Sequence, residues 1–287
     1  MASENNRKTV VIGTIRSALA LRMSGSVRSR LEANLGDTDI KIEAAGPEID
    51  DVAGLISILR STEIGAVLVP GAQLPNPLSD DLEIAVVMKR QNPRDVFLAK
   101  SGSGLGDIPE GAGVNFTTLQ SQIQVCHARP DFMPIGLQGS PAIHIEQLRM
   151  GWCDGLVMPG DEAEALRAGD LVVDHISMST SLPLPGQGSA VIVARKDDEA
   201  TLAALQGADD AKSRRCIEAE RSIETRFQIA EWLVAVWVRS QTKKISAEAA
   251  LIAQDGSAIV RDAFSGPHAD FESMAQALTD SLSESAS

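Results

Sequence analysis

The sequence predicts an α/β protein of two or three domains. Three observations carry this prediction: the length of 287 residues, β-branched runs of strand length, and helical spacing of apolar residues between those runs. The hydrophobic share of 44% and the charged share of 23% are ordinary for a soluble globular protein with a buried core.

The N-terminal part alternates predicted strands and helices. Residues 9–13 form a β-branched run that predicts a buried strand, and Ser17 can cap the helix that follows it. Further along, the patterns predict an alternating strand over residues 39–44, a helix over residues 50–59 and a central strand over residues 66–70. The strand–turn–helix order around Ser17 either forms an anion site from free backbone N–H groups or reflects plain packing of a strand and a helix.

The C-terminal part predicts a small α+β unit. A charged helix is expected from Asp210 onward, and a turn at residues 255–256 separates two of the strands that follow. These strands are expected from Trp232, from Ser246 and over residues 257–263. The closing helix is predicted over residues 271–278, and residues 281–287 are expected to form a frayed polar tail.

Composition excludes several classes of function. The net charge of −13 argues against a nucleic-acid or anionic-membrane partner, because both need a basic face. The three cysteines, Cys126, Cys153 and Cys216, are too few and too scattered for a disulfide framework or a zinc site. No apolar run approaches membrane-spanning length, and no signal-peptide pattern precedes the first strand. The expectation is a cytoplasmic protein with no metal site.

Four short motifs resemble those of the porphobilinogen deaminase (hydroxymethylbilane synthase) family. They are Pro-Arg-Asp at 93–95, Arg-Pro-Asp at 129–131, Pro-Gly-Gln-Gly at 185–188 and Arg-x-x-x-Thr-Arg at 221–226. The resemblance implies two periplasmic-binding-protein-like α/β domains joined by crossover strands, and a small C-terminal α+β domain. The expected boundaries are 1–96 with 191–209 for domain 1, 97–190 for domain 2 and 210–287 for domain 3.

The same resemblance indicates which groups of the family are missing here. Glu231 stands where the family carries the cysteine that anchors its dipyrromethane cofactor, so no such cofactor is expected. Gln73, or at best Ala72, stands where the family has its catalytic aspartate, and Arg16 lies one position later than the family's arginine. Four further family arginines are replaced, by Gln120, Ser121, Gln138 and His144.

The family's cleft lies between its first two domains. Carried over position by position, the cleft of this chain is expected to be rich in hydroxyl and amide groups that bind the substrate, with few fixed charges. Its expected lining is Ser17, Gln73, Thr117, Thr118, Gln120, Ser121, Gln138, Ser140, His144 and Gln187, with Arg16 beside Ser17. His144 is expected to act as an acid or base, and Glu231 to be buried at the cleft as a base. Either residue can also be a hydrogen-bonded or solvated side chain without a catalytic role.

Three functions are compatible with these patterns. The first is a re-purposed deaminase-like enzyme of specialised biosynthesis, which performs acid–base chemistry on a small polar metabolite. Elimination of a leaving group with formation of a C–N bond is one expected form of this chemistry. The second is a non-catalytic subunit that binds a partner protein, with Trp232 and Trp237 as candidates for an exposed apolar patch. The third is a genuine hydroxymethylbilane synthase.

Overall fold

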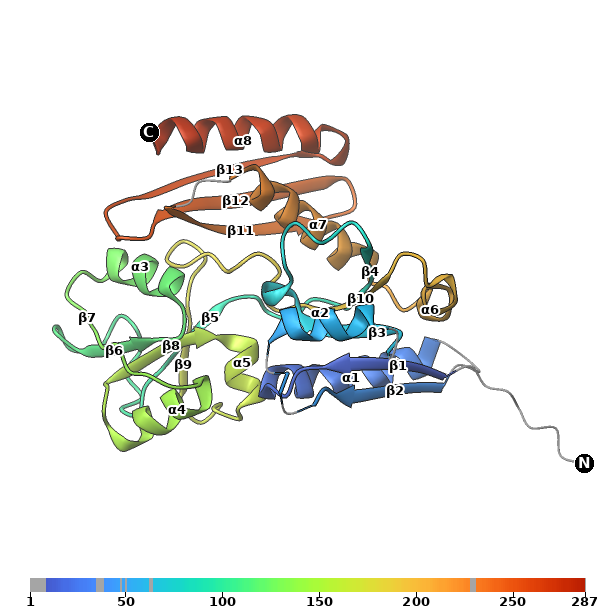
Figure 1. Cartoon of the computed structure of the whole chain (residues 1–287). Coiled ribbons are helices and arrows are strands. Elements are labelled where there is room, and N and C mark those ends of the chain that lie inside the picture. Colours follow the sequence, from blue (N-terminus) through green and yellow to red (C-terminus); the bar gives the residue numbers. More distant parts are fainter. Residues whose placement is uncertain are drawn as a thin grey trace, which may run out of the picture. The chain divides into compact units, whose positions relative to one another are not determined.

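The computed structural model describes residues 9–34, 39–46, 48–49, 51–61, 64–227 and 231–286. Contacts within the chain divide it into two units, shown in Figure 1. The first comprises Met1–Arg90 and Ser189–Arg214, and the second comprises Gln91–Gly188 and Arg215–Ser287. Residues 228–230, which belong to the segment aligned with the family's cofactor loop, lie outside the described residues.

A five-stranded mixed sheet forms the core of the first unit. Its strands are β1 (Thr9–Thr14), β2 (Asp39–Ala44), β3 (Ala66–Pro70), β4 (Leu82–Val87) and β10 (Ala190–Arg195). They lie in the order β2-β1-β3-β10-β4, where β1 is parallel to β2 and β3, and β10 is antiparallel to β3 and β4. Because β3 and β10 are paired on both sides, they are buried along almost their whole length.

The first unit contains the two helices that the sequence predicts, after Ser17 and over residues 50–59, and two short ones that it does not. They are α1 (Ala18–Asn34), α2 (Val52–Arg60), the short 3₁₀-helix Gly71–Gln73 and α6 (Glu199–Leu205). The Ser17 hydroxyl accepts the backbone N–H of Ala20 at 3.1 Å, which confirms its capping role. The Asp51 carboxylate caps α2 in the same way, at 2.7 Å from the Gly54 nitrogen. The apolar stripe of α2 is buried as its spacing predicts.

The second unit contains a second five-stranded mixed sheet. Its strands are β5 (Asp95–Leu98), β6 (Gly113–Phe116), β7 (Met133–Pro134), β8 (Gly155–Pro159) and β9 (Val172–His175). Their order is β7-β6-β8-β5-β9. β6 is parallel to β7 and β8, whereas β5 is antiparallel to β8 and β9. The predicted α/β class with two sheets of crossover strands is confirmed.

Three helices follow the parallel strands of this second sheet. They are α3 (Leu119–Ala128), α4 (Pro141–Met150) and α5 (Gly160–Ala165). The α4 helix ends at Gly151, whose φ of 79° places it in the left-handed region that glycine enters at low cost.

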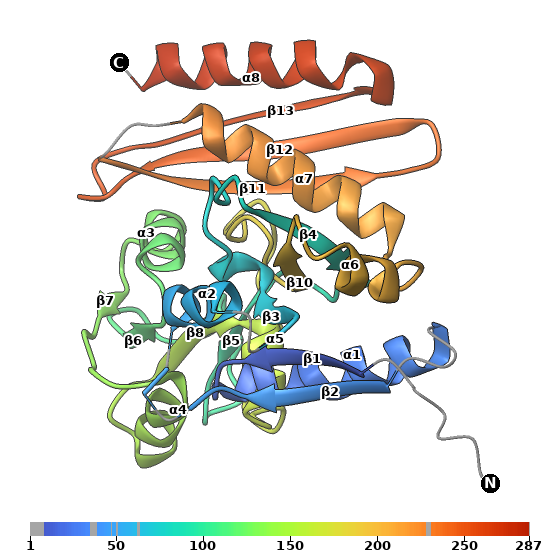
Figure 2. The ribbon, with the colours of Figure 1, turned by 45° about the vertical axis from the view of Figure 1, so that its right-hand side comes forward.

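A three-stranded antiparallel sheet forms the C-terminal part of the second unit. Its strands β11 (Trp232–Ser240), β12 (Lys244–Ala253) and β13 (Ile259–Pro267) lie in chain order. The helices α7 (Ala211–Arg226) and α8 (Phe271–Ser285) share one apolar core with this sheet, and the 3₁₀-helix His268–Asp270 precedes α8. In Figures 1 and 2, α8 runs alongside β13.

The predicted frayed tail is wrong. The closing helix begins at Phe271 as expected, but it continues to Ser285 rather than ending at Leu278. The reason is Leu282, which lies one helical turn beyond Leu278 and is fully buried in the same core. The run of serines around Leu282 hides this continuation in the sequence.

The opposite face of the C-terminal sheet packs against the α3 region of the same unit. Ile123 and Leu182 share a buried cluster with Ala235, Ala250 and Ile252. The Arg261 guanidinium adds hydrogen bonds of 2.7–3.2 Å to the Gln124 side chain and to the carbonyl oxygens of residues 178–180. These contacts hold the C-terminal sheet against the α/β part of the unit.

No helix within the described part of the chain is long and apolar enough to cross a membrane.

Candidate functional site

The predicted site residues of the first unit lie at one edge of its sheet. Arg16 and Ser17 follow β1, and Gln73 ends the 3₁₀-helix that follows β3. Because β1 and β3 are parallel neighbours, their carboxyl ends meet at the same edge. The exposed Arg16 donates from Nε to the Ala45 carbonyl at 3.0 Å, which fastens the end of β2, and Gln73 is exposed.

In the second unit, four predicted residues surround the N-terminus of α3. Thr117 follows β6, and the Thr118 hydroxyl caps the helix by accepting the Ser121 N–H at 3.2 Å. The hydroxyls of Thr118 and Ser121 are 2.6 Å apart. Gln120 and Ser121 are both buried. The predicted position of the threonine pair at a helix N-terminus is therefore confirmed.

The other predicted residues of this unit follow β7. Gln138 and Ser140 are exposed in the segment before α4, and His144 is buried in the first turns of that helix. Since β7 is parallel to β6, this segment starts at the same edge of the sheet as Thr117. The second unit thus brings both groups of predicted residues to the carboxyl ends of its parallel strands.

Buried polar atoms without partners distinguish this edge of the sheet. Thr117 Oγ1, Gln120 Nε2 and both ring nitrogens of His144 are buried, with no well-aligned hydrogen-bond partner among the described residues. Asn115 Nδ2 and Gln147 Oε1, which the sequence prediction missed, are in the same condition. Each such atom costs about 1–3 kcal/mol unless water or a ligand satisfies it. Thr117, Gln120 and His144 lie in the segments that follow the neighbouring parallel strands β6 and β7, where a polar ligand could satisfy them.

The protonation state of His144 follows from its surroundings. Burial lowers its pKa, and the backbone of Leu137 opposes that shift only in part. The imidazole is therefore neutral at neutral pH, with one ring nitrogen able to accept a proton and the other able to donate one.

Three acidic side chains at the same edge were not predicted as site residues. Asp95 begins β5 and pairs with Pro159 at the carboxyl end of β8, directly before Asp161 and Glu162 in α5. Burial, with a smaller contribution from the charge of Asp161, raises the pKa of Asp95 to about 6 and that of Glu162 to about 7. Groups that titrate near neutral pH are suited to proton transfer.

Gln187 makes hydrogen bonds within the second unit, and its predicted contact with substrate stays a prediction. Its amide nitrogen donates to the Pro93 carbonyl at 2.7 Å and to the Asp95 carboxylate at 2.9 Å, and its amide oxygen accepts the Leu184 N–H at 3.2 Å. The Ser181 hydroxyl donates to the other Asp95 oxygen at 3.0 Å. Gln187 therefore holds the Asp95 carboxylate in place.

Glu231 lies in the turn before β11, where its carbonyl accepts the Gln254 N–H at 3.0 Å. The side chain is exposed, so the expected burial of Glu231 is wrong. Its position at the open end of the β11–β12 pair gives it no covering element within the described part of this unit.

The residues present do not fit a covalently attached dipyrromethane. The thioether that anchors this cofactor in the family needs a cysteine thiol, and a carboxylate such as that of Glu231 cannot form it. Cys216 is buried in the C-terminal core, Cys153 is buried before β8, and Cys126 lies on α3. None of the three cysteines of the chain lies in the segment that leads into β11.

Comparison with known proteins assigns the fold to a family. Residues 10–203 match the family model described as porphobilinogen deaminase, dipyromethane cofactor binding domain. The chain belongs to the porphobilinogen deaminase family. It is 31% identical over 232 residues to the porphobilinogen deaminase of Brevibacillus brevis, covering 76% of this chain and 75% of that one. It is 30% identical over 277 residues to that of Desulforudis audaxviator, covering 91% and 90%.

Solved structures with a similar arrangement include the VFT2 domain of Bordetella pertussis BvgS. That domain is 15% identical and has a TM-score of 0.47, covering 75% of this chain and 92% of the domain.

Within the described residues, no group of three or more His, Cys, Asp or Glu side chains is arranged to hold a metal ion.

Proposed function

We propose that this member of the porphobilinogen deaminase family performs acid–base chemistry on a small polar metabolite, without dipyrromethane and without assembling a tetrapyrrole. The observation that carries the proposal is that Thr117, Gln120 and His144, at one edge of the sheet, carry buried polar atoms without a well-aligned hydrogen-bond partner among the described residues. A ligand that both donates and accepts hydrogen bonds would satisfy these atoms. Thr117, Gln120 and the neutral His144 carry no fixed positive charge, so they do not favour a polycarboxylate.

His144 is the proposed acid–base residue. A neutral imidazole can take a proton from an attacking amine while the C–N bond forms and the bond to the leaving group breaks. Return of that proton to the departing group would complete its displacement by the amine. The raised pKa values of Asp95 and Glu162 support proton transfer at the same sheet edge. Glu231 is exposed, so it lacks the buried environment that was expected to make it a base.

The partner-binding alternative has less support. Trp232 packs partly against the C-terminal core, and Trp237 packs partly against the cluster that faces α3. The Arg239 guanidinium also lies over the Trp237 ring, at 4.6 Å from its centroid. The two tryptophans thus lie on different faces of the sheet and do not form one apolar patch.

The proposal is tested by untargeted mass spectrometry of a metabolite extract incubated with the purified chain. We expect one small polar compound to be consumed by the wild-type protein and by the S281A variant, which alters an exposed residue of α8 outside the site. The H144Q variant should leave that compound intact while retaining the circular dichroism spectrum of the wild type. Full turnover by H144Q would refute the role of His144.

Porphobilinogen itself is the second substrate to test. We expect no linear tetrapyrrole to form, and we expect the intact mass of the protein to equal that of the polypeptide. An added mass of two linked pyrroles, or formation of hydroxymethylbilane, would establish the genuine synthase instead.

A further inference from the structure

A cavity lies at the edge of the α/β sheet of the second unit that is opposite to the candidate site. Its volume is about 610 Å³, within the range of small-molecule sites. The cavity is formed by the segments that follow β5 and precede β6 and β8, together with Leu148 of α4. Because β6 and β8 begin there and the antiparallel β5 ends there, the cavity is separated from the candidate site by the length of the strands.

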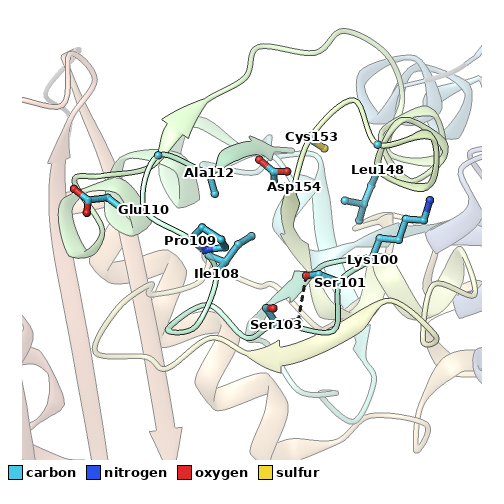
Figure 3. A pocket seen from close by; sticks show the side chains of 12 residues that line it. Lys100, Ser101, Ser103, Ile108, Pro109, Glu110, Ala112, Leu148, Cys153 and Asp154 are labelled. Atoms are coloured by element: carbon cyan, nitrogen blue, oxygen red, sulfur yellow. Dashed lines mark hydrogen bonds between the residues drawn. The ribbon is translucent and has the colours of Figure 1, made fainter.

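Apolar side chains form the body of the cavity. Ile108 and Leu148 line it from opposite sides but are buried, at 4% and 0% exposure, whereas the ring of Pro109 is exposed to it (Figure 3). Cys153 adds a thiol whose pKa is raised to about 11, first by burial and then by the charge of Asp154. This thiol is therefore protonated at neutral pH and contributes an apolar surface rather than a nucleophile.

Two opposite charges lie at separate points of the cavity's edge, as Figure 3 shows for Asp154 and Lys100. One oxygen of Asp154 accepts the Gly113 N–H at 2.8 Å, which fixes the carboxylate. None of the described residues donates a hydrogen bond to its other oxygen. The Lys100 ammonium donates to the Arg149 carbonyl at 3.2 Å, and two of its three N–H groups remain for a ligand.

Hydroxyl groups continue the polar edge beyond Lys100. Ser101 and Ser103 both line the cavity, and the Ser101 oxygen accepts the Ser103 N–H at 3.2 Å. Glu110 also belongs to the lining segment, but in Figure 3 its carboxylate is directed away from the enclosed space. The Lys100 side chain extends past Leu148, away from Asp154, so the carboxylate and the ammonium stand at opposite ends of the cavity's edge (Figure 3).

We propose that this cavity is a second ligand site, which binds a small zwitterion with an apolar side chain, such as an amino acid or a dipeptide. The ligand's ammonium pairs with Asp154, its carboxylate pairs with Lys100 and the serine hydroxyls, and its side chain contacts the exposed ring of Pro109 and the small exposed part of Ile108. A molecule with only one of the two charges leaves the other protein charge unpaired and binds more weakly. The inference is independent of the proposed function, because it uses none of the same residues.

Calorimetry with L-leucine and L-leucylglycine tests this site on the full chain. We expect at least one of the two to bind with a Kd below about 10 mM, and at least about tenfold more tightly than its singly charged analogues. For L-leucine these are 4-methylpentanoate, which lacks the ammonium, and 3-methylbutylamine, which lacks the carboxylate. Absence of binding by both zwitterions, or equal binding of the analogues, would overturn the proposal.

Matched variants locate the binding. D154N removes the charge while its amide oxygen can still accept the Gly113 N–H, so the loop is expected to keep its fold and affinity to fall about tenfold or more. E110Q removes the same charge from a side chain directed away from the cavity, and we expect it to bind like the wild type. Unchanged affinity in D154N, or an equal loss in E110Q, would contradict the assignment. H144Q is expected to bind the zwitterion with wild-type affinity, so failure of this proposal can be told apart from failure of the proposed function.

Discussion

Replacing Asp95 by Asn should change how stability depends on pH. The Asp95 carboxyl is 5% exposed and is held by donors from Gln187 and Ser181. Burial raises its pKa from 3.8 to about 6 despite these two hydrogen bonds, so the folded protein binds its proton more tightly than the unfolded chain does. An asparagine resembles the protonated carboxyl, because its oxygen can accept from Gln187 while its nitrogen donates to Ser181.

The sign of the effect follows from proton linkage. An acid whose pKa is raised on folding contributes stability below its unfolded pKa and loses it as the pH rises through its folded pKa. At about 1.4 kcal/mol per pKa unit, ionisation of Asp95 costs the folded state about 3 kcal/mol above pH 6. About 1 kcal/mol of this loss of stability occurs between about pH 5.2 and pH 7.5. The Asn variant does not ionise and therefore does not lose it.

Urea denaturation of both proteins across this pH range measures the effect. The acidic chain, with its net charge of −13 at pH 7, approaches its isoelectric point at lower pH, so the series starts near pH 5.2. We expect the stability gain of D95N over the wild type to grow by about 1 kcal/mol with rising pH. S181A removes a donor to the charged form, raises the pKa of Asp95 further and should steepen the wild-type trend. A difference between D95N and wild type that stays constant with pH would refute the reasoning.

Three further predictions concern the stability of the second unit. Arg261→Met should cost about 2 kcal/mol and increase amide hydrogen exchange in residues 178–182, whereas Arg261→Lys should retain part of that protection. Leu282→Ala should cost about 2–5 kcal/mol in thermal or urea unfolding, because it leaves a cavity in the C-terminal core, whereas Ser281→Ala should change stability by less than about 0.5 kcal/mol. Gly151→Ala forces alanine into a left-handed conformation and should cost about 1 kcal/mol, whereas Gly169→Ala, in open space without positive φ, should be near neutral.

The helices and strands of the core could be predicted because the sequence patterns that indicate them are local. β-Branched runs identified β1 and β3, and the spacing of apolar residues identified α2 with its buried face. Strand bounds in the C-terminal sheet were less accurate: β12 begins at Lys244 rather than Ser246, and β13 continues to Pro267 rather than ending at Ala263. Pairing with the neighbouring strand extends both elements, and such pairing is not visible in either segment alone.

The site could be predicted only in part, for a reason of topology. Thr118 and His144 follow parallel strands, so strand order alone brings them to one edge of the sheet. Asp95 is the first residue of its strand, and only the antiparallel direction of β5 places it beside Asp161 and Glu162. The strand's direction depends on its partner β8, which lies about 60 residues further along the chain. No local pattern around Asp95 reports that pairing.

The position of β10 constrains the order in which the first unit can be completed. β10 lies between β3 and β4 in the finished sheet, although the whole α/β part of the second unit separates it from β4 in the chain. During synthesis, β1, β2 and β3 can pair first, but the outer edge of β3 stays open until Ala190–Arg195 leaves the ribosome. Folding of the inserted residues 91–188 brings the two flanking segments together, since the Gln91 N–H donates to the Gly188 carbonyl at 2.8 Å. The inserted domain thus shortens the loop that β10 must close, and nascent chains halted before residue 190 should expose a strand edge prone to aggregation.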